Sequence, residues 1–199
     1  MIRLLLFSLL LLPATAAAAP VQPLPALEQL RQSFAGMQDF TAEIVQEKQL
    51  AIMKKKIVST GTVRFRKPDL FYLELLPPHA SRMVLRDTVI ELYLPKEKSR
   101  QQITLPANEG LQRWFTLLAK PVTTLPEGLA IQADRGADSQ TVTITPEKPG
   151  QVRSFTITSG SDGKPRRLVI DERNGNRTAI SFQKLRTNVG LTEKDFQIE

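Results

Sequence analysis

The best candidates for a binding function lie in the segment from Ser59 to Pro78, where basic residues interrupt a strand pattern. Arg64, Arg66 and Lys67 fall within four positions and are followed directly by Pro68. Proline interrupts strand pairing, so this corner is predicted to lie at the rim of a sheet. Cationic side chains at a rim can face an anionic headgroup or donate hydrogen bonds to an element that covers the sheet. We therefore predict that Arg64, Arg66 and Lys67 contact a lid or a lipid headgroup.

Catalytic chemistry has little support in the residues. The chain contains no cysteine, which excludes disulfides, thiolate nucleophiles, cysteine-based zinc sites and a lipid anchor on cysteine. The single histidine, His79, lies in a proline-rich loop sequence and is interpreted as a surface residue. No hydrolase, zinc-protease or phosphate-loop motif occurs. We therefore predict that the protein is not an enzyme and uses no metal or cofactor.

The first residues have the pattern of a secretory signal peptide. A basic start is followed by an apolar run from Leu4 to Leu12 and then by small residues. The run is shorter than the roughly 20 apolar residues that span a bilayer. We predict a signal peptide over residues 1–18, a single domain over residues 19–199, and a periplasmic location.

The charge of the chain favours anionic partners. Its formal charge is +7, and the predicted mature part keeps 26 basic against 20 acidic residues, because the signal peptide contains only Arg3. Such a surface attracts phospholipid headgroups, lipopolysaccharide or acidic proteins. Nucleic acid is not expected as a partner, since an exported protein without a binding motif rarely meets it.

Hydrophobic periodicity predicts two helices and about ten strands. The first helix covers residues 24–37, and the second begins near Asn108 and ends at Lys120. Short alternating segments fill the rest of the chain, joined by turns such as Asn174-Gly175 and ending in a last strand over residues 195–199. Local hairpins indicate an antiparallel sheet, which curls at this length. The helices are expected to cover its concave face.

One face of the predicted strands is continuously apolar. Its residues are Val63, Phe65, Phe71, Leu73, Leu75, Ile90, Leu92 and Leu94. The second helix adds Leu111, Trp114, Phe115 and Leu118 at helical spacing. These twelve side chains are our candidates for a lipid-binding cavity. The alternative is an ordinary core sealed by the helices, and composition does not choose between the two.

The chain resembles the LolA family of periplasmic carriers of outer-membrane lipoproteins. The resemblance runs through FTAEIVQEK (Phe40–Lys48), GTVRFRKPDLFYLEL (Gly61–Leu75), ELYLP (Glu91–Pro95) and the closing hairpins from Ser154 to Glu199. These segments occur in the family's order over nearly the whole predicted mature chain. The resemblance implies a mainly β fold, with an incomplete, half-open antiparallel barrel and amphipathic helices over its concave face.

The resemblance also implies a function. A LolA-like chaperone binds the acyl chains of lipoproteins in a hydrophobic cavity and ferries them from the inner to the outer membrane. The implied partners are this lipoprotein or other acylated lipid cargo, an inner-membrane ABC transporter as donor and an outer-membrane acceptor lipoprotein. We expect the carrier to be a monomer.

Two departures from the family pattern leave the cargo open. The basic residue before the proline holds the lid closed in the family; that position is Lys67 here, where arginine is usual, and Arg66 or Arg64 could share the contact. Leu73 stands where the family has a tryptophan. The remaining alternatives are a carrier of another lipid or glycolipid, and a lipid-sensing or envelope-stress regulatory binding domain.

Overall fold

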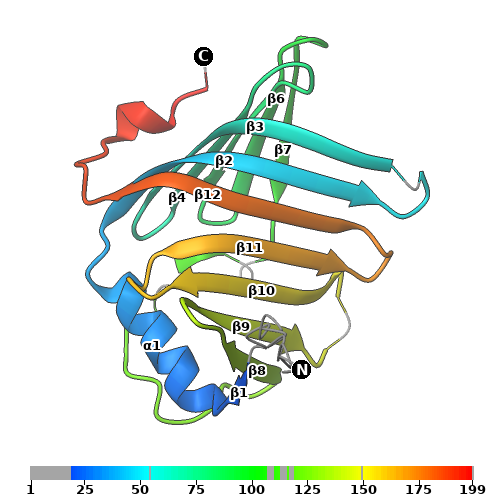
Figure 1. The fold of residues 1–199 in the computed structure, drawn as a ribbon. Coiled ribbons are helices and arrows are strands. Elements are labelled where there is room, and N and C mark those ends of the chain that lie inside the picture. Colours follow the sequence, from blue (N-terminus) through cyan, green and yellow to red (C-terminus); the bar gives the residue numbers. More distant parts are fainter. Residues whose placement is uncertain are drawn as a thin grey trace, which may run out of the picture.

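The computed structural model describes residues 19–53, 55–106, 110–112, 116, 119–148 and 150–198. Within these ranges the chain forms a twelve-stranded antiparallel sheet, one labelled α-helix and a short 3-10 helix (Figure 1). The predicted signal peptide lies outside the described residues. Most of the second predicted helix lies outside them too, including Trp114, Phe115 and Leu118.

The sheet consists of two antiparallel meanders. Its strands are β1 (Ala19–Val21), β2 (Asp39–Leu50), β3 (Lys55–Arg66), β4 (Leu70–Leu75), β5 (Ser81–Arg86), β6 (Val89–Leu94), β7 (Ser99–Thr104), β8 (Leu129–Arg135), β9 (Ser139–Pro146), β10 (Val152–Gly160), β11 (Pro165–Glu172) and β12 (Arg177–Thr187). Their order across the sheet is β1-β8-β9-β10-β11-β12-β2-β3-β4-β5-β6-β7, so the meanders β2–β7 and β8–β12 meet where β12 pairs with β2. The sheet curls strongly without closing (Figure 1), which confirms the predicted half-open architecture.

Two segments differ from the predicted elements. Ala19–Val21, for which the sequence pattern predicted no strand, pairs with β8 as the edge strand β1. The predicted last strand is wrong, because residues 193–196 form the 3-10 helix η2 (Glu193–Phe196) instead. Asp195 accepts hydrogen bonds from the backbone N–H and the hydroxyl of Thr192, which closes a capping box at the start of η2.

The helix α1 (Pro23–Ala35) covers part of the concave face. Proline at its first positions has no N–H to leave unpaired and suits a helix start. Ala26, Leu27 and Leu30 recur at helical spacing and pack on the side chains of β8 and β9, chiefly Ile131 and Val142. The helix ends two residues before the predicted boundary.

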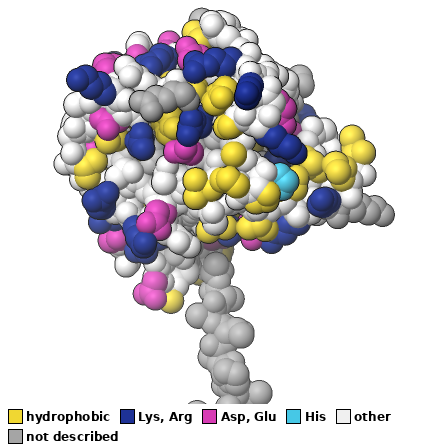
Figure 2. Space-filling model, turned by 90° about the horizontal axis from the view of Figure 1, so that it is seen from above, with side chains coloured by type: hydrophobic (Ala, Val, Ile, Leu, Met, Phe, Trp, Pro, Cys, Tyr) yellow, Lys and Arg dark blue, Asp and Glu magenta, His cyan; other side chains and the backbone are white. Residues whose placement is uncertain are grey.

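The β2–β3 hairpin projects beyond β4, whereas β12 accompanies β2 on the other side as far as Gln49. β2 and β3 pair from Asp39 opposite Arg66 to Leu50 opposite Lys55, whereas β4 ends opposite Gly61. The hairpin therefore extends past the β4–β5 turn at one end of the sheet (Figure 1). Viewed from above, hydrophobic side chains gather on the side where this hairpin projects (Figure 2).

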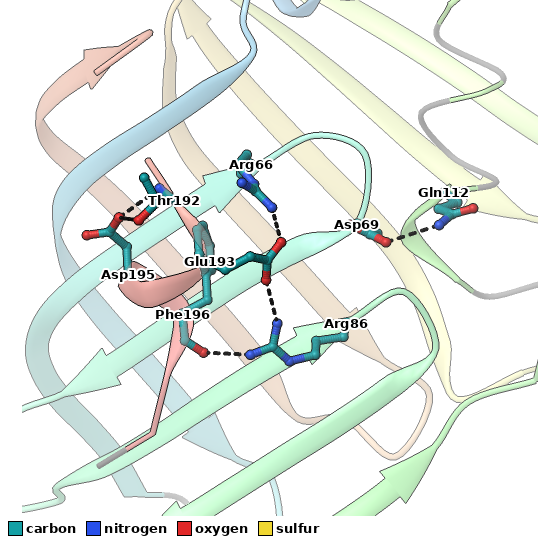
Figure 3. A network of polar contacts seen from close by, with 8 residues as sticks. All are labelled: Arg66, Asp69, Arg86, Gln112, Thr192, Glu193, Asp195 and Phe196. Carbon is teal, nitrogen blue, oxygen red and sulfur yellow. Dashed lines mark hydrogen bonds and ion pairs between the residues drawn. The ribbon is translucent and has the colours of Figure 1, made fainter. Parts of the chain in front are cut away.

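The C-terminal segment, residues 188–198, lies on the convex side of the sheet (Figures 1 and 3). Phe196 is fully buried and packs on Leu70, Tyr72 and Val84 of β4 and β5. The convex side of β4 and β5 thus carries a small second core rather than a solvated surface. Asp39, at the start of β2, anchors this segment, since its carboxylate accepts hydrogen bonds from the backbone N–H groups of residues 189–191 at 2.7–3.2 Å.

Candidate functional site

Strand register brings the predicted cavity residues of β3, β4 and β6 onto the concave face. In the β3–β4 pair Val63 lies opposite Leu73 and Phe65 lies opposite Phe71. Leu75, opposite Gly61, continues the same row, and β5 connects the row to Ile90 and Leu92, with Leu94 next along β6. The concave side of these strands is therefore apolar from β3 to β6.

This apolar face is sealed in one part and accessible in another. Val63 and Phe65 are 1% and 3% exposed and belong to a core with Phe40 and Ile44 of β2. The predicted residues of β4 and β6 are only half-buried, as is Leu111. The first part is an ordinary core. The second part is partly exposed, although its β4 side chains also pack against this core.

The sequence interpretation missed several members of this face. Met83 and Leu85 of β5 lie between the predicted rows of β4 and β6. Their alternation with Arg82 and Arg86 is a signal in the sequence, which the apolar Val84 between them weakens. The same face continues through Ile44, Phe182 and Ile180 to the strands that α1 covers; these positions depend on pairings between strands far apart in the sequence.

A pocket of about 460 Å³ lies at the rim between α1 and the Lys67-Pro68 corner. Its lining comes from the last turns of α1, the corner, and the connection from β7 to β8: Arg31, Phe34, Ala35, Lys67, Pro68, Gln112, Thr116 and Ala119. Three segments that are distant in the sequence therefore border one opening.

Lys67 joins the corner to the end of α1. Its Nζ donates to the carbonyl oxygens of Phe34 at 2.6 Å and Ala35 at 3.3 Å. These carbonyls lie at the helix C-terminus, where a cation interacts favourably with the helix dipole. Burial lowers the pKa of the Lys67 ammonium. The contact thus ties the covering helix to the sheet at the pocket.

Arg64 and Arg66 lie on the convex side instead. The Arg64 guanidinium donates to the carbonyl oxygen of Asp195 at 2.7 Å and stacks over the ring of Tyr72. Arg66 and Arg86 both contact the Glu193 carboxylate (Figure 3). Successive side chains of a strand point to opposite faces, so residues two apart in β3 share the side away from α1. Both arginines hold the C-terminal segment.

The connection between β7 and β8 is tied at two points around the pocket. On the sheet side, Gln112 donates to the Asp69 carboxylate at 3.0 Å (Figure 3), and its backbone N–H donates to Asp87. On the helix side, the N–H of Val122 donates to the Glu28 carboxylate of α1 at 2.9 Å. The connection therefore spans from the β5–β6 turn to α1.

Glu28 belongs to the rim, although no sequence signal singled it out. The Arg31 guanidinium, 2.7 Å away, and the Val122 N–H together lower the pKa of this carboxyl to about 2. A folded-state pKa below the ordinary value of 4.5 means that the ionised carboxylate contributes its full stability above pH 4.5, and that this contribution is lost as the pH falls through about 2. In the folded protein the carboxylate itself stays ionised until the pH approaches 2. We expect protection of the Val122 amide against hydrogen exchange to persist at pH 4.

The same hydrogen-exchange measurement on the Glu28→Gln variant tests whether the carboxylate charge protects the Val122 amide. Glutamine keeps one oxygen acceptor and removes the charge, so Val122 protection should fall and lose its dependence on pH near 2. A wild-type carboxyl that titrates in an NMR experiment near its ordinary pKa would contradict the expected contact.

Comparison with known proteins identifies the family of this chain. The family model "Outer membrane lipoprotein carrier protein LolA" matches residues 35–199 of this chain. The chain belongs to the LolA family. The match includes the Lys67-Pro68 corner, the concave face of β3–β6 and the C-terminal segment that Arg64 and Arg66 hold. The sequence resemblance is therefore confirmed at the level of the family.

Individual relatives are distant. An outer-membrane lipoprotein carrier protein from Chromohalobacter salexigens is 24% identical over 141 residues, which cover 70% of this chain and 66% of that relative. An uncharacterized conserved protein from Thermus thermophilus has a similar fold, with a TM-score of 0.50, 13% identity and coverage of 88% of this chain and 92% of that one. A LolA superfamily protein from Nitrosomonas europaea gives a TM-score of 0.47 at 9% identity, covering 89% and 99% of the two chains.

The described part of this LolA-family chain contains no helix with the length and apolar character needed to cross a bilayer.

Proposed function

We propose that the protein is a periplasmic carrier that binds the acyl chains of lipoproteins on its concave face and delivers them to the outer membrane. The observation that carries this proposal is the half-buried apolar face of β4–β6 beside a hydrogen-bonded rim. The family match supports it, because the matching model describes a lipoprotein carrier. The predicted signal peptide supports the periplasmic location.

The rim contacts suit a carrier that must both take up and release its cargo. Each buried methylene of an acyl chain contributes about 0.8 kcal/mol to binding, so a large apolar face alone would hold the lipid too tightly. Contacts that favour the closed, empty state offset part of this gain and keep the affinity moderate. In our proposal these contacts are Lys67 with α1, and Glu28 with Val122.

The donor and the acceptor would supply the energy and the direction of lipid transport. The sequence has no phosphate-binding loop, so a donor such as an inner-membrane ABC transporter would load the carrier. An outer-membrane acceptor lipoprotein would unload it. The positive net charge of the chain would favour docking on acidic surfaces of these partners.

Native mass spectrometry of the protein purified from its own periplasm tests the proposal directly. Bound triacylated lipoproteins would support it. If another lipid or glycolipid is bound instead, the protein is a carrier but its cargo is not a lipoprotein. A protein that stays empty when offered lipoproteins and lipids would overturn the carrier proposal in favour of a regulatory binding domain.

Replacing Lys67 by leucine is expected to slow cargo release about tenfold. The variant lacks both hydrogen bonds to the end of α1, and a hydrogen bond to a charged group contributes about 1.5–3 kcal/mol. The closed state then competes less well with the lipid. Transfer of a fluorescent lipopeptide to acceptor vesicles measures the rate. Lys67→Arg keeps the cation and should release cargo at nearly the wild-type rate; equal release by both variants would contradict the proposed role.

A further inference from the structure

The tip of the β2–β3 hairpin exposes large apolar side chains. Ile52 is 97% exposed and Met53 is 61% exposed. Val58 and Leu76 are also exposed and lie at the same end of the sheet, since the N–H of Leu76 donates to the Thr60 carbonyl. These four residues, which we call the tip patch, make up most of the large exposed hydrophobic residues in the described chain. Figure 2 shows hydrophobic side chains gathered on this side of the molecule.

Lysines flank the hairpin residues of the tip patch in the sequence. From Lys48 to Val58 the chain has four lysines and no acidic residue. Lys48 and Lys55 are exposed in the structure, and Lys56 pairs with the Glu47 carboxylate at 2.8 Å. Apolar residues flanked by lysines are typical of segments that lie in the interface of an anionic membrane.

The hairpin is braced as a projection rather than folded back on the sheet. The backbone N–H of Ala51 donates to the Asn176 side-chain oxygen in the β11–β12 turn at 3.1 Å. Pairing between β2 and β3 continues to Leu50 opposite Lys55. Ile52 and Met53 therefore lie at the end of a braced, convex hairpin. Such a shape can insert between the headgroups of a lipid bilayer.

We propose that the tip patch docks this protein on an anionic phospholipid surface. Ile52 and Met53 insert between the headgroups, while Lys48 and Lys55 face the lipid phosphates. Twelve-residue strands rising about 3.3 Å per residue separate the tip from the Lys67 corner by roughly 36 Å, so docking leaves the pocket rim free. This surface is separate from the cargo face, and the inference does not depend on which cargo the protein carries.

Flotation with vesicles tests the docking surface. The protein, expressed from its full-length gene, is mixed with vesicles of phosphatidylglycerol and phosphatidylethanolamine, or of phosphatidylcholine alone. We expect it to float with the anionic vesicles and to remain largely unbound with phosphatidylcholine. The double variant Ile52→Ser with Met53→Ser should lower the partition coefficient at least about tenfold, and Lys55→Glu should lower it at low salt.

Matched controls come from the other end of the sheet. Val189→Ser removes an exposed apolar side chain beside Asp39, and Lys164→Glu reverses a charge in the β10–β11 turn. Both should float like the wild type. Leu92→Glu alters the cargo face and should also float normally, which separates docking from uptake of a lipid. Wild-type protein that ignores anionic vesicles, or a double tip variant that floats as well as the wild type, would overturn the proposal.

Discussion

Replacing Gly61 by alanine is expected to destabilise the protein by about 3 kcal/mol or more. Gly61 lies in β3 opposite Leu75 of β4. A Cβ at this position would overlap the carbonyl oxygen of Glu74 and lie 2.9 Å from its carbonyl carbon. These are backbone atoms of a paired strand, so no side-chain rotation can relieve the overlap. The β3–β4 pair, which carries both the concave face and the Lys67 corner, would have to shift.

Urea denaturation measures this effect, and Gly36→Ala is its control. Gly36 follows α1 with a right-handed backbone, and a Cβ there would meet no atom within 4 Å. Alanine at position 36 should therefore leave the unfolding midpoint unchanged or raise it slightly. If the Gly61→Ala variant unfolds at the same urea concentration as the wild type, β3 and β4 can move apart at this position without loss of stability, which contradicts the prediction.

Replacing Leu92 by glutamate is expected to weaken binding of an acylated ligand about 100-fold. Leu92 is half-buried on the concave face of β6, opposite Met83 of β5. An acyl chain lying there would have to desolvate a carboxylate that has no partner, which costs about 3 kcal/mol. That free energy corresponds to about two orders of magnitude in the dissociation constant. Titration with a fluorescent lipopeptide measures the change.

Thr104→Glu separates the effect of position from the effect of charge. Thr104 is exposed on β7 and pairs with Val89, which points away from the concave face. The same new charge on that side should leave the affinity within about twofold of the wild type, because surface charges interact weakly across the sheet. If a folded Leu92→Glu variant binds as tightly as the wild type, the acyl chains do not lie over β6.

Local pattern in the sequence determined much of the fold. Alternating apolar residues predicted the strands β2–β12, and helical spacing predicted α1. The same alternation assigned Phe71, Leu73 and Leu92 to one side, and strand register places them together. These features could be predicted because each depends on residues a few positions apart, whose geometry follows from the regular repeat of a strand or helix.

The tertiary structure alone determined the long-range partners of the charged and polar groups. Arg66 and Glu193 are 127 positions apart, and Glu28 and Val122 are 94 apart. Their contacts depend on how a curled sheet brings distant segments together, which no local spacing encodes. For the same reason the sequence predicted a rim role for Arg64 and Arg66 alongside Lys67, whereas the structure places only Lys67 against α1.

The exposure of each apolar side chain also required the three-dimensional structure. Ile52, Val63 and Leu92 are all apolar residues in or beside strands, yet their exposure differs. Ile52 projects from a hairpin tip, Val63 is buried in the core, and Leu92 is half-buried on the concave face. Alternation gives the direction of a side chain relative to the strand. Whether another element covers that side depends on packing between segments that are far apart in the sequence, and so it is decided only when the whole sheet curls.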